Sequence, residues 1–214
     1  MAKLRPFRDY DEKDVINLYS MDLTTGTNAD GAISLGSDWS GKLSHGHVVA
    51  VGGAGGWNKG QELHEMLGDA GAGSSGLTNV TTQRYGVTAK LRSAGGALVP
   101  LGMTLFHVAQ YDENGEQLKF NPRKASELEA VIDGQAVPVV TRGIFLVNGV
   151  DVSNQGDGTA VALDATWLAA GGKLYAGADG SITSGANDGS NDLAQIGKGL
   201  GIVSGGDVLM KLEL

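Results

Sequence analysis

The chain has 214 residues, with 35 glycines, 4 prolines, no cysteine and a net charge of −8 at pH 7. This much glycine disfavours long helices, and the acidic charge argues against a broad nucleic-acid-binding face, which needs basic residues to displace counterions. Without cysteine there are no disulfides, no thiolate metal sites and no cysteine nucleophiles.

Residues 1–40 differ from the rest of the chain and are predicted to form an extended N-terminal arm, for which a frayed terminus is the alternative. No apolar run follows the first residues, and no stretch reaches the ~18 apolar residues of a membrane-spanning helix, so we expect neither a signal peptide nor a membrane partner. The first ten residues hold three basic and two aromatic side chains, which are Lys3, Arg5, Phe7, Arg8 and Tyr10.

Residues 41–214 are predicted to form one β-rich domain. Asn-Gly, Asp-Gly and Gly-Gly pairs lie between short apolar stretches, and such pairs suit the tight turns of β-hairpins. Five hairpins at this spacing predict an all-β sandwich or barrel. Their turns are expected at residues 112–115, 133–134, 148–149, 179–180 and 205–206.

The last strand shows the period of two most clearly. Val208, Met210 and Leu212 fall on one face of the predicted strand, as does Leu214. Lys211 and the glutamate after Leu212 fall on the other face, so this strand is expected to have one buried and one solvated side.

Proline and short helices interrupt the strand pattern. Pro138 lacks a backbone donor, so the stretch 137–140 is predicted to be an edge strand or to be bulged. Asn121-Pro122 is a capping sequence for a predicted short helix over 123–128. A second short helix is predicted over 61–67, ahead of a glycine-rich loop at 68–79.

Two histidines form the best candidate for a metal site. His45 and His47 are two residues apart, so on a strand they would share a face, and a third ligand would complete a site. Cupin barrels use a similar His-x-His, but the glutamate that follows it there is missing here, where the next residues are 48–53. Ordinary hydrogen bonding by strand and turn residues is the alternative, and no cofactor is predicted.

Other catalytic patterns are not readable in the sequence. The glycines at 52–56 followed by Lys59 fail as a phosphate loop, because Gly60 stands where Ser or Thr is needed. There is no Gly-x-Ser-x-Gly elbow. A pair of glycosidase carboxylates need not be close in the chain, so it cannot be judged from spacing. We expect a protein that is not an enzyme.

Trp57 is the tryptophan most expected to contact a partner. It lies among glycines and outside any predicted strand, and tryptophan is enriched at the energetic centres of interfaces. Packing beneath the barrel as part of a loop core is the alternative.

Several segments between residues 137 and 214 follow one another in an order that resembles the small capsid decoration, or cement, proteins of tailed bacteriophages. They are an apolar strand through a glycine at 139–147, Ala165-Thr166-Trp167, a Gly-Gly hairpin entry at 171–175, then 179–183, 196–200 and 207–212. Residues 44–49 and 100–104 resemble the family's first strands, which extends the resemblance over somewhat more than half of the chain. The arm at 1–40, a loop at 53–80 and an insertion at 112–130 depart from it.

The resemblance implies a compact, β-barrel-like "tulip" fold with short helices, made in the host cytoplasm and placed on the capsid exterior of the virion. The implied partners are the major capsid protein and further copies of the chain, as a trimer or a dimer. Many weak contacts on a repeating lattice add through multivalency and stabilise the assembled shell. The basic and aromatic residues of the first ten positions would then dock on an acidic shell.

Two other functions stay open on the sequence alone. One is a metal-binding β-barrel enzyme of the cupin kind, built on His45 and His47. The other is a β-domain that binds glycans or a host surface.

Overall fold

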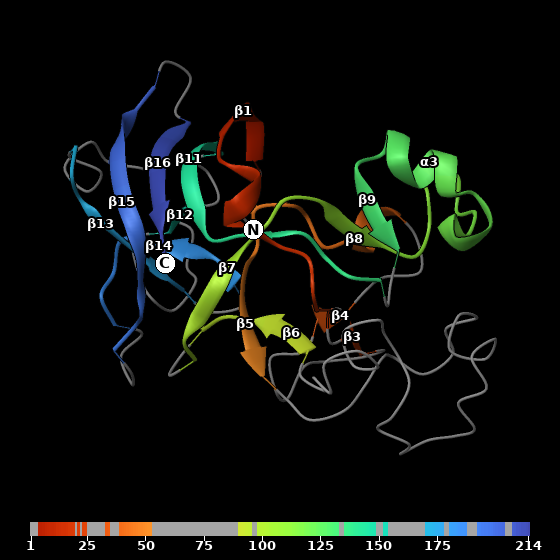
Figure 1. Cartoon of the computed structure of the whole chain (residues 1–214), viewed down its shortest axis with the longest axis horizontal. Helices are drawn as coiled ribbons and strands as arrows, with labels where there is room; N and C mark the ends of the chain where they lie inside the picture. Colours follow the sequence, from red (N-terminus) through yellow and green to blue (C-terminus); the bar gives the residue numbers. More distant parts are fainter. Residues whose placement is uncertain are drawn as a thin grey trace.

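The chain is mostly β-strand in the computed structural model, with one α-helix and three short 3-10 helices among the described residues (Figure 1). The all-β prediction is confirmed, but the described strands form open sheets and do not close into a barrel. The described residues are 4–19, 21, 23–24, 33–34, 39–52, 90–95, 98–132, 135–148, 152–153, 170–177, 180–187, 192–203 and 207–214.

Seven strands form what we call the large sheet, in the order β1-β11-β16-β15-β13-β14-β12. Its neighbours are antiparallel except for β12 and β14, which run parallel. Its strands are β1 (Leu4–Asp9), β11 (Arg142–Val147), β12 (Val152–Ser153), β13 (Lys173–Ala176), β14 (Ile182–Thr183), β15 (Gln195–Ile202) and β16 (Val208–Glu213).

Five strands form the middle sheet, in the order β2-β10-β7-β5-β6. Its strands are β2 (Val15–Ile16), β10 (Val139–Val140), β7 (Pro100–Thr104), β5 (Val48–Gly52) and β6 (Lys90–Ser93). Two parallel pairs complete the strands: β3 (Leu23–Thr24) with β4 (Ile33–Ser34), and β8 (His107–Ala109) with β9 (Ala130–Ile132). The helices are η1 (Glu12–Asp14), η2 (Trp39–Gly41), η3 (Leu118–Phe120) and α3 (Pro122–Glu127).

The middle sheet is covered on both faces. Val48 and Ala50 of β5 pack in one core cluster with Phe145 of the large sheet. Val49, between them, packs in a second cluster with Val108 of β8. Successive strand residues point to opposite faces, so a run of fully buried neighbours requires a layer on each side. Figure 1 shows the same arrangement, with the large sheet at one end and β8, β9 and α3 at the other.

A glycine allows the middle strands to approach closely. A Cβ atom on Gly102 of β7 would overlap the backbone oxygen of Val140 in β10. Backbone atoms cannot move aside as a side-chain tip can, so this position of the middle sheet requires the smallest residue.

Three of the five predicted turns connect paired segments. β13 pairs with β14 across residues 179–180, and β15 pairs with β16 across 205–206. At 112–115, a bridge joins Tyr111 to Gln117, and the Asp112 carboxylate accepts hydrogen bonds from the backbone of Asn114 and Glu116. This hairpin at 112–115 is shorter than predicted, because the chain continues into η3.

The other two predicted hairpins are wrong. β9 and β10 flank residues 133–134 but lie in different sheets, where β9 pairs with β8 and β10 lies between β2 and β7. β11 and β12 flank residues 148–149 but lie far apart in the large sheet. The apolar stretches were strands as predicted, but each found a partner distant in sequence, which a turn dipeptide cannot indicate.

The described part of the N-terminal segment is bound to the domain rather than separate from it. β1 is a terminal strand of the large sheet, paired with β11 with a bulge between Leu4 and Arg8. Leu4 is only 5% exposed and belongs to the core. β2 likewise pairs with β10 of the middle sheet.

Two local predictions concern proline. Pro138 directly precedes β10, and its carbonyl accepts a hydrogen bond from Leu105, so the strand begins after the proline and lies inside the sheet rather than at an edge. The Asn121 side chain caps α3 by accepting from the backbone of Lys124, with Pro122 at the first helical position. The predicted helix at 61–67 and the loop at 68–79 lie outside the described residues.

Candidate interaction surface

The two histidines of the metal hypothesis diverge. His45 lies in a turn with Gly46, which has a φ of 84°, and β5 begins only at Val48. The positive φ breaks the strand alternation, so the two imidazoles do not share a strand face as expected. The Nδ1 atom of His45 accepts a hydrogen bond from the backbone of Leu4, and its ring stacks on His107 with centroids 4.1 Å apart.

His47 points into the core instead. Its Nε2 atom lies 2.9 Å from the Ser93 hydroxyl, and its ring fills the space beside Gly180, where any Cβ would overlap it. Gly180 also has a φ of 70°. Burial lowers the pKa of His47 to about 3, so the ring is neutral at pH 7.

His107 is also neutral at pH 7, and burial is again the main cause. Its Nδ1 atom accepts a hydrogen bond from the backbone of His45. Burial, with the neighbouring His45 and Lys42 adding to it, lowers the pKa of His107 to about 3. Within the residues that the structure describes, no group of three or more metal-ligating side chains gathers. These histidines tie the turn at 44–47 to β1 and β8.

Most of the predicted N-terminal contact residues have partners within the chain. Arg5 forms an ion pair with Asp207, with Nε 3.0 Å from a carboxylate oxygen. Arg8 reaches the carbonyl of Leu105 at 3.4 Å and the carboxylate of Glu129 at 3.2 Å. Tyr10 stacks on Phe145 with ring centroids 5.9 Å apart. Lys3 and Trp57 lie outside the described residues.

Phe7 is a predicted contact residue that faces solvent, and it is more exposed than Tyr10. Its side chain is 51% exposed, in the bulged stretch of β1 between the anchored Leu4 and Arg8. β1 is terminal in the large sheet, so one side of its backbone is not paired with another described strand. Pro6 and the bulge in β1 disfavour pairing of this edge with another strand, so the Phe7 side chain is the feature that β1 offers to a partner.

The face of the large sheet that points away from the middle sheet is a second candidate surface, which we call the outer face. Phe145 and Met210 point into the core, so their neighbours in β11 and β16 point outward. Lys173, Lys198 and Lys211 lie directly opposite one another on three adjacent strands of this face. Like charges in this register repel each other, which is a cost to the sheet itself.

One carboxylate lies within this basic row. Glu213 pairs with Lys211 at 3.1 Å. The pKa of Glu213 is lowered first by that hydrogen bond and its charge, and further by Arg142 and Lys198. Several cations therefore reach one exposed carboxylate, and this face is locally basic in an acidic chain.

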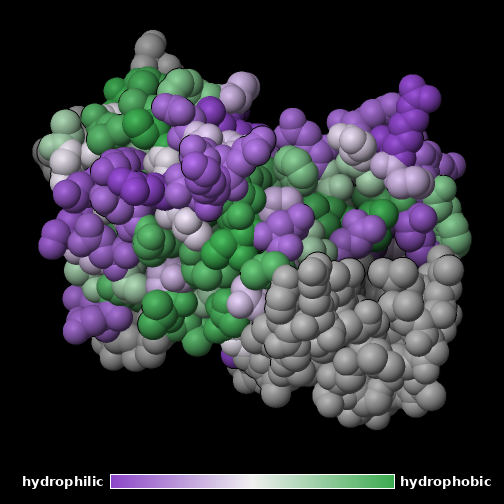
Figure 2. All heavy atoms as spheres, in the orientation of Figure 1, coloured by the Kyte–Doolittle hydropathy of each residue, from purple (hydrophilic) through white to green (hydrophobic). Residues whose placement is uncertain are grey.

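An apolar region adjoins the basic row towards the β15–β16 turn. Leu200, Ile202 and Val203 are each 37–38% exposed. Figure 2 shows hydrophobic residues gathered beneath the tip of this hairpin, with hydrophilic residues next to them. Sequence reasoning noted the alternation in β16 but not the row, because its members come from residues 173, 198 and 211, and their register appears only in the folded sheet.

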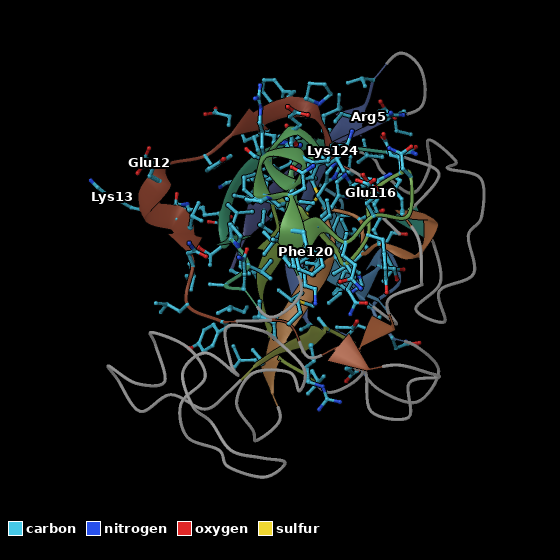
Figure 3. All side chains as sticks on the ribbon, turned by 90° about the vertical axis from the view of Figure 1, so that its right-hand side faces the viewer. Arg5, Glu12, Lys13, Glu116, Phe120 and Lys124 are labelled. Atoms are coloured by element: carbon cyan, nitrogen blue, oxygen red, sulfur yellow. The ribbon has the colours of Figure 1, made fainter. Side chains whose placement is uncertain are left out.

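A third exposed feature is Phe120 at the end of η3. It is 69% exposed, and the ammonium of Lys119 lies 4.8 Å from its ring centroid. Figure 3 shows Phe120 with Glu116 and Lys124 on the same side of the molecule, around α3. A single aromatic ring with an ammonium group over it is a smaller apolar feature than the region beside β15.

No protein family, curated protein or solved structure matches this chain in comparisons with each of the three sets. Among the helices of the described residues, none has the length and apolar character that crossing a membrane requires.

Proposed function

We propose that the protein is a structural virion protein that binds the outer surface of a capsid and stabilises the shell by bridging major capsid subunits. The observation that carries the proposal is Phe7, an exposed aromatic ring on an open sheet edge whose neighbours are held in place. Arg5 and Arg8 are engaged in ion pairs and Leu4 is in the core. A contact residue on so fixed a segment loses little conformational freedom on binding.

The family resemblance supports the same function. The segments at 171–175, 179–183, 196–200 and 207–212 fall on neighbouring strands of the large sheet. The resembling segments at 44–49 and 100–104 belong to the middle sheet instead. On this proposal the chain performs no catalysis, and the histidines have a structural role in holding β1.

Co-sedimentation with capsids tests the proposal. Empty, expanded capsids assembled from the major capsid protein of the same genome are mixed with the full chain and pelleted. We expect the bound chain to saturate at a fixed ratio to capsid subunits, because a lattice offers a set number of equivalent positions. A chain that stays in the supernatant at every concentration would refute capsid binding.

Matched aromatic variants locate the contact. Phe7→Ala is expected to weaken capsid binding by about tenfold or more, as truncation of a central aromatic residue does at interfaces. Phe120→Ala, which removes an even more exposed ring elsewhere, is expected to bind as the parent does. Equal effects of the two variants would mean that Phe7 is not the contact. Deleting the segment is a poorer test, because Leu4 belongs to the core.

A further inference from the structure

The outer face carries three directly opposed pairs on β11 and β16, the second and third strands of the large sheet. β11 and β16 are antiparallel neighbours, and their outward-facing residues alternate with core residues. The pairs are Arg142 with Glu213, Ile144 with Lys211, and Leu146 with Leu209. One pair is oppositely charged, one is apolar, and the pair between them joins an apolar residue to the long aliphatic stem of a lysine.

These central residues are not used by the core. Ile144, Leu146 and Leu209 belong to none of the hydrophobic clusters that the described residues form. Arg142 and Glu213 are exposed. Their solvent-facing position, on two strands that are not at the edge of the sheet, leaves a patch that a suitable second surface could cover.

The pattern is complementary to itself. A rotation by 180° about an axis that runs parallel to the strands, midway between β11 and β16, turns the face towards a second copy and exchanges the two strands. Position along the strands is kept, so Arg142 then lies over Glu213 of the second copy, and Leu146 over its Leu209. We propose that two copies of the chain pack through this outer face as a two-fold dimer.

The flanking strands extend the match. Asp9 of β1 is level with Ile144 on one side of the axis, and Lys198 of β15 is level with Lys211 on the other. The same rotation brings Asp9 over Lys198 of the second copy. Asp9 lies at one end of this row and the lysines at the other, so the opposite charges meet only when the row faces its own reverse, and the dimer gives Lys198 a carboxylate to face.

The size of the patch sets the expected strength. Four strands about 4.8 Å apart (β1, β11, β16 and β15), with about six residues rising ~3.3 Å each, give a flat footprint of roughly 380 Å². Standard interfaces bury about 800 Å² per partner, so we expect a weak dimer whose population depends on concentration. Aligned packing of twisted sheets, at about −30°, favours the contacts nearest the axis, which are those of β11 and β16.

Charge reversal tests the dimer on the isolated chain. Sedimentation equilibrium from about 1 μM to about 1 mM is expected to show the parent passing from monomer to dimer. Arg142→Glu and Glu213→Arg are each expected to weaken self-association by roughly tenfold or more, since each reversal places like charges at both symmetry-related contacts. Both residues are exposed, so thermal unfolding of the monomers should be nearly unchanged.

Mixing the two variants is the decisive step. Arg142→Glu chains and Glu213→Arg chains are opposite in charge at both contacts, so a heterodimer is expected to form where neither variant forms a homodimer. A parent that is monomeric throughout, a parent that forms trimers, variants that dimerise as the parent does, or a mixture that stays monomeric would each overturn the proposal. The measurement needs no capsid, so its outcome is separate from that of the capsid-binding test.

Discussion

The two main sheets of this protein are built from similar strands but differ in how many of their faces are buried. The middle sheet is covered on both faces, and consecutive residues such as Val48, Val49 and Ala50 are fully buried. The large sheet buries one face and leaves the other patterned with lysines, an acid and half-buried leucines. The middle sheet is thus specified almost wholly by packing. In the proposed dimer the large sheet uses one face for packing and the other for binding a second copy.

The largest expected effect compares neighbouring residues on the two faces of β11. Phe145→Ala, in the core at 0% exposure, is expected to cost about 3–5 kcal/mol of the free energy of unfolding through lost burial and the cavity it leaves. Leu146→Ala, on the outer face, should cost about 1 kcal/mol or less in the monomer. Urea unfolding at low protein concentration measures both. Similar costs would mean that the outer face is packed like the inner one.

The second effect is a pH dependence located between the two sheets. The pKa of His47 is about 3 when folded against an ordinary value of 6.5, so the unfolded chain binds more protons between these pH values. The stability that depends on the neutral form of His47 is therefore fully present above pH 6.5, and it is lost as the pH falls towards 3. At pH 4.5 the loss from His47 is expected to be about 2–3 kcal/mol. His107 adds to it in the same direction, less strongly because it is partly exposed.

Chemical unfolding of the parent and of His47→Gln at several pH values measures this slope. The variant is expected to lose a large part of the pH dependence, whatever its stability at pH 7. An unchanged slope would show that His47 does not hold its neutral form through burial.

The third effect sharpens the contrast within the middle sheet. Gly102→Ala places a methyl group against the backbone of Val140 and should cost about 1–3 kcal/mol. Gly52→Ala, near the end of β5, meets only the side chain of Arg92, which can move, and should cost less. Thermal unfolding of the pair measures the difference. Equal melting temperatures would argue against close strand approach as the reason for glycine at 102.

The smallest effect lies outside both sheets. Asn121→Ala removes the side chain that caps α3 and is expected to cost about 1 kcal/mol. Asn114→Ala, at the exposed turn before it, removes no side-chain cap and serves as the control. Urea midpoints of the two variants give the comparison. A loss as large as that of Phe145→Ala would mean that α3 supports the core far more than its position indicates.

A feature of this fold can be predicted from the sequence when the residues that form it are close together along the chain. The cap at Asn121, the turn at 112–115 and the alternation of β16 are local, and residue chemistry predicts them. Pairing between distant strands is not local, and for this reason two of the five predicted hairpins were wrong although their strands exist. A turn dipeptide does not exclude a longer connection to a better-matched partner.

The candidate surfaces follow the same rule. Phe7 was predicted as a contact residue from composition alone, and the structure places it on an exposed edge. The internal partners of Arg5, Arg8 and Tyr10 lie 121 or more residues further along the chain or at Leu105, so no local pattern in the sequence indicates them. The outer-face pairs require the register of β11 and β16, which the core residues between them set.

The most direct test of the central claim is a cryo-microscopy reconstruction of capsids incubated with the full chain. We expect density for the chain at regular positions on the outside of the shell, with β1 and Phe7 against the major capsid protein. Capsids with a bare exterior, under conditions in which the chain is folded and in excess, would contradict it.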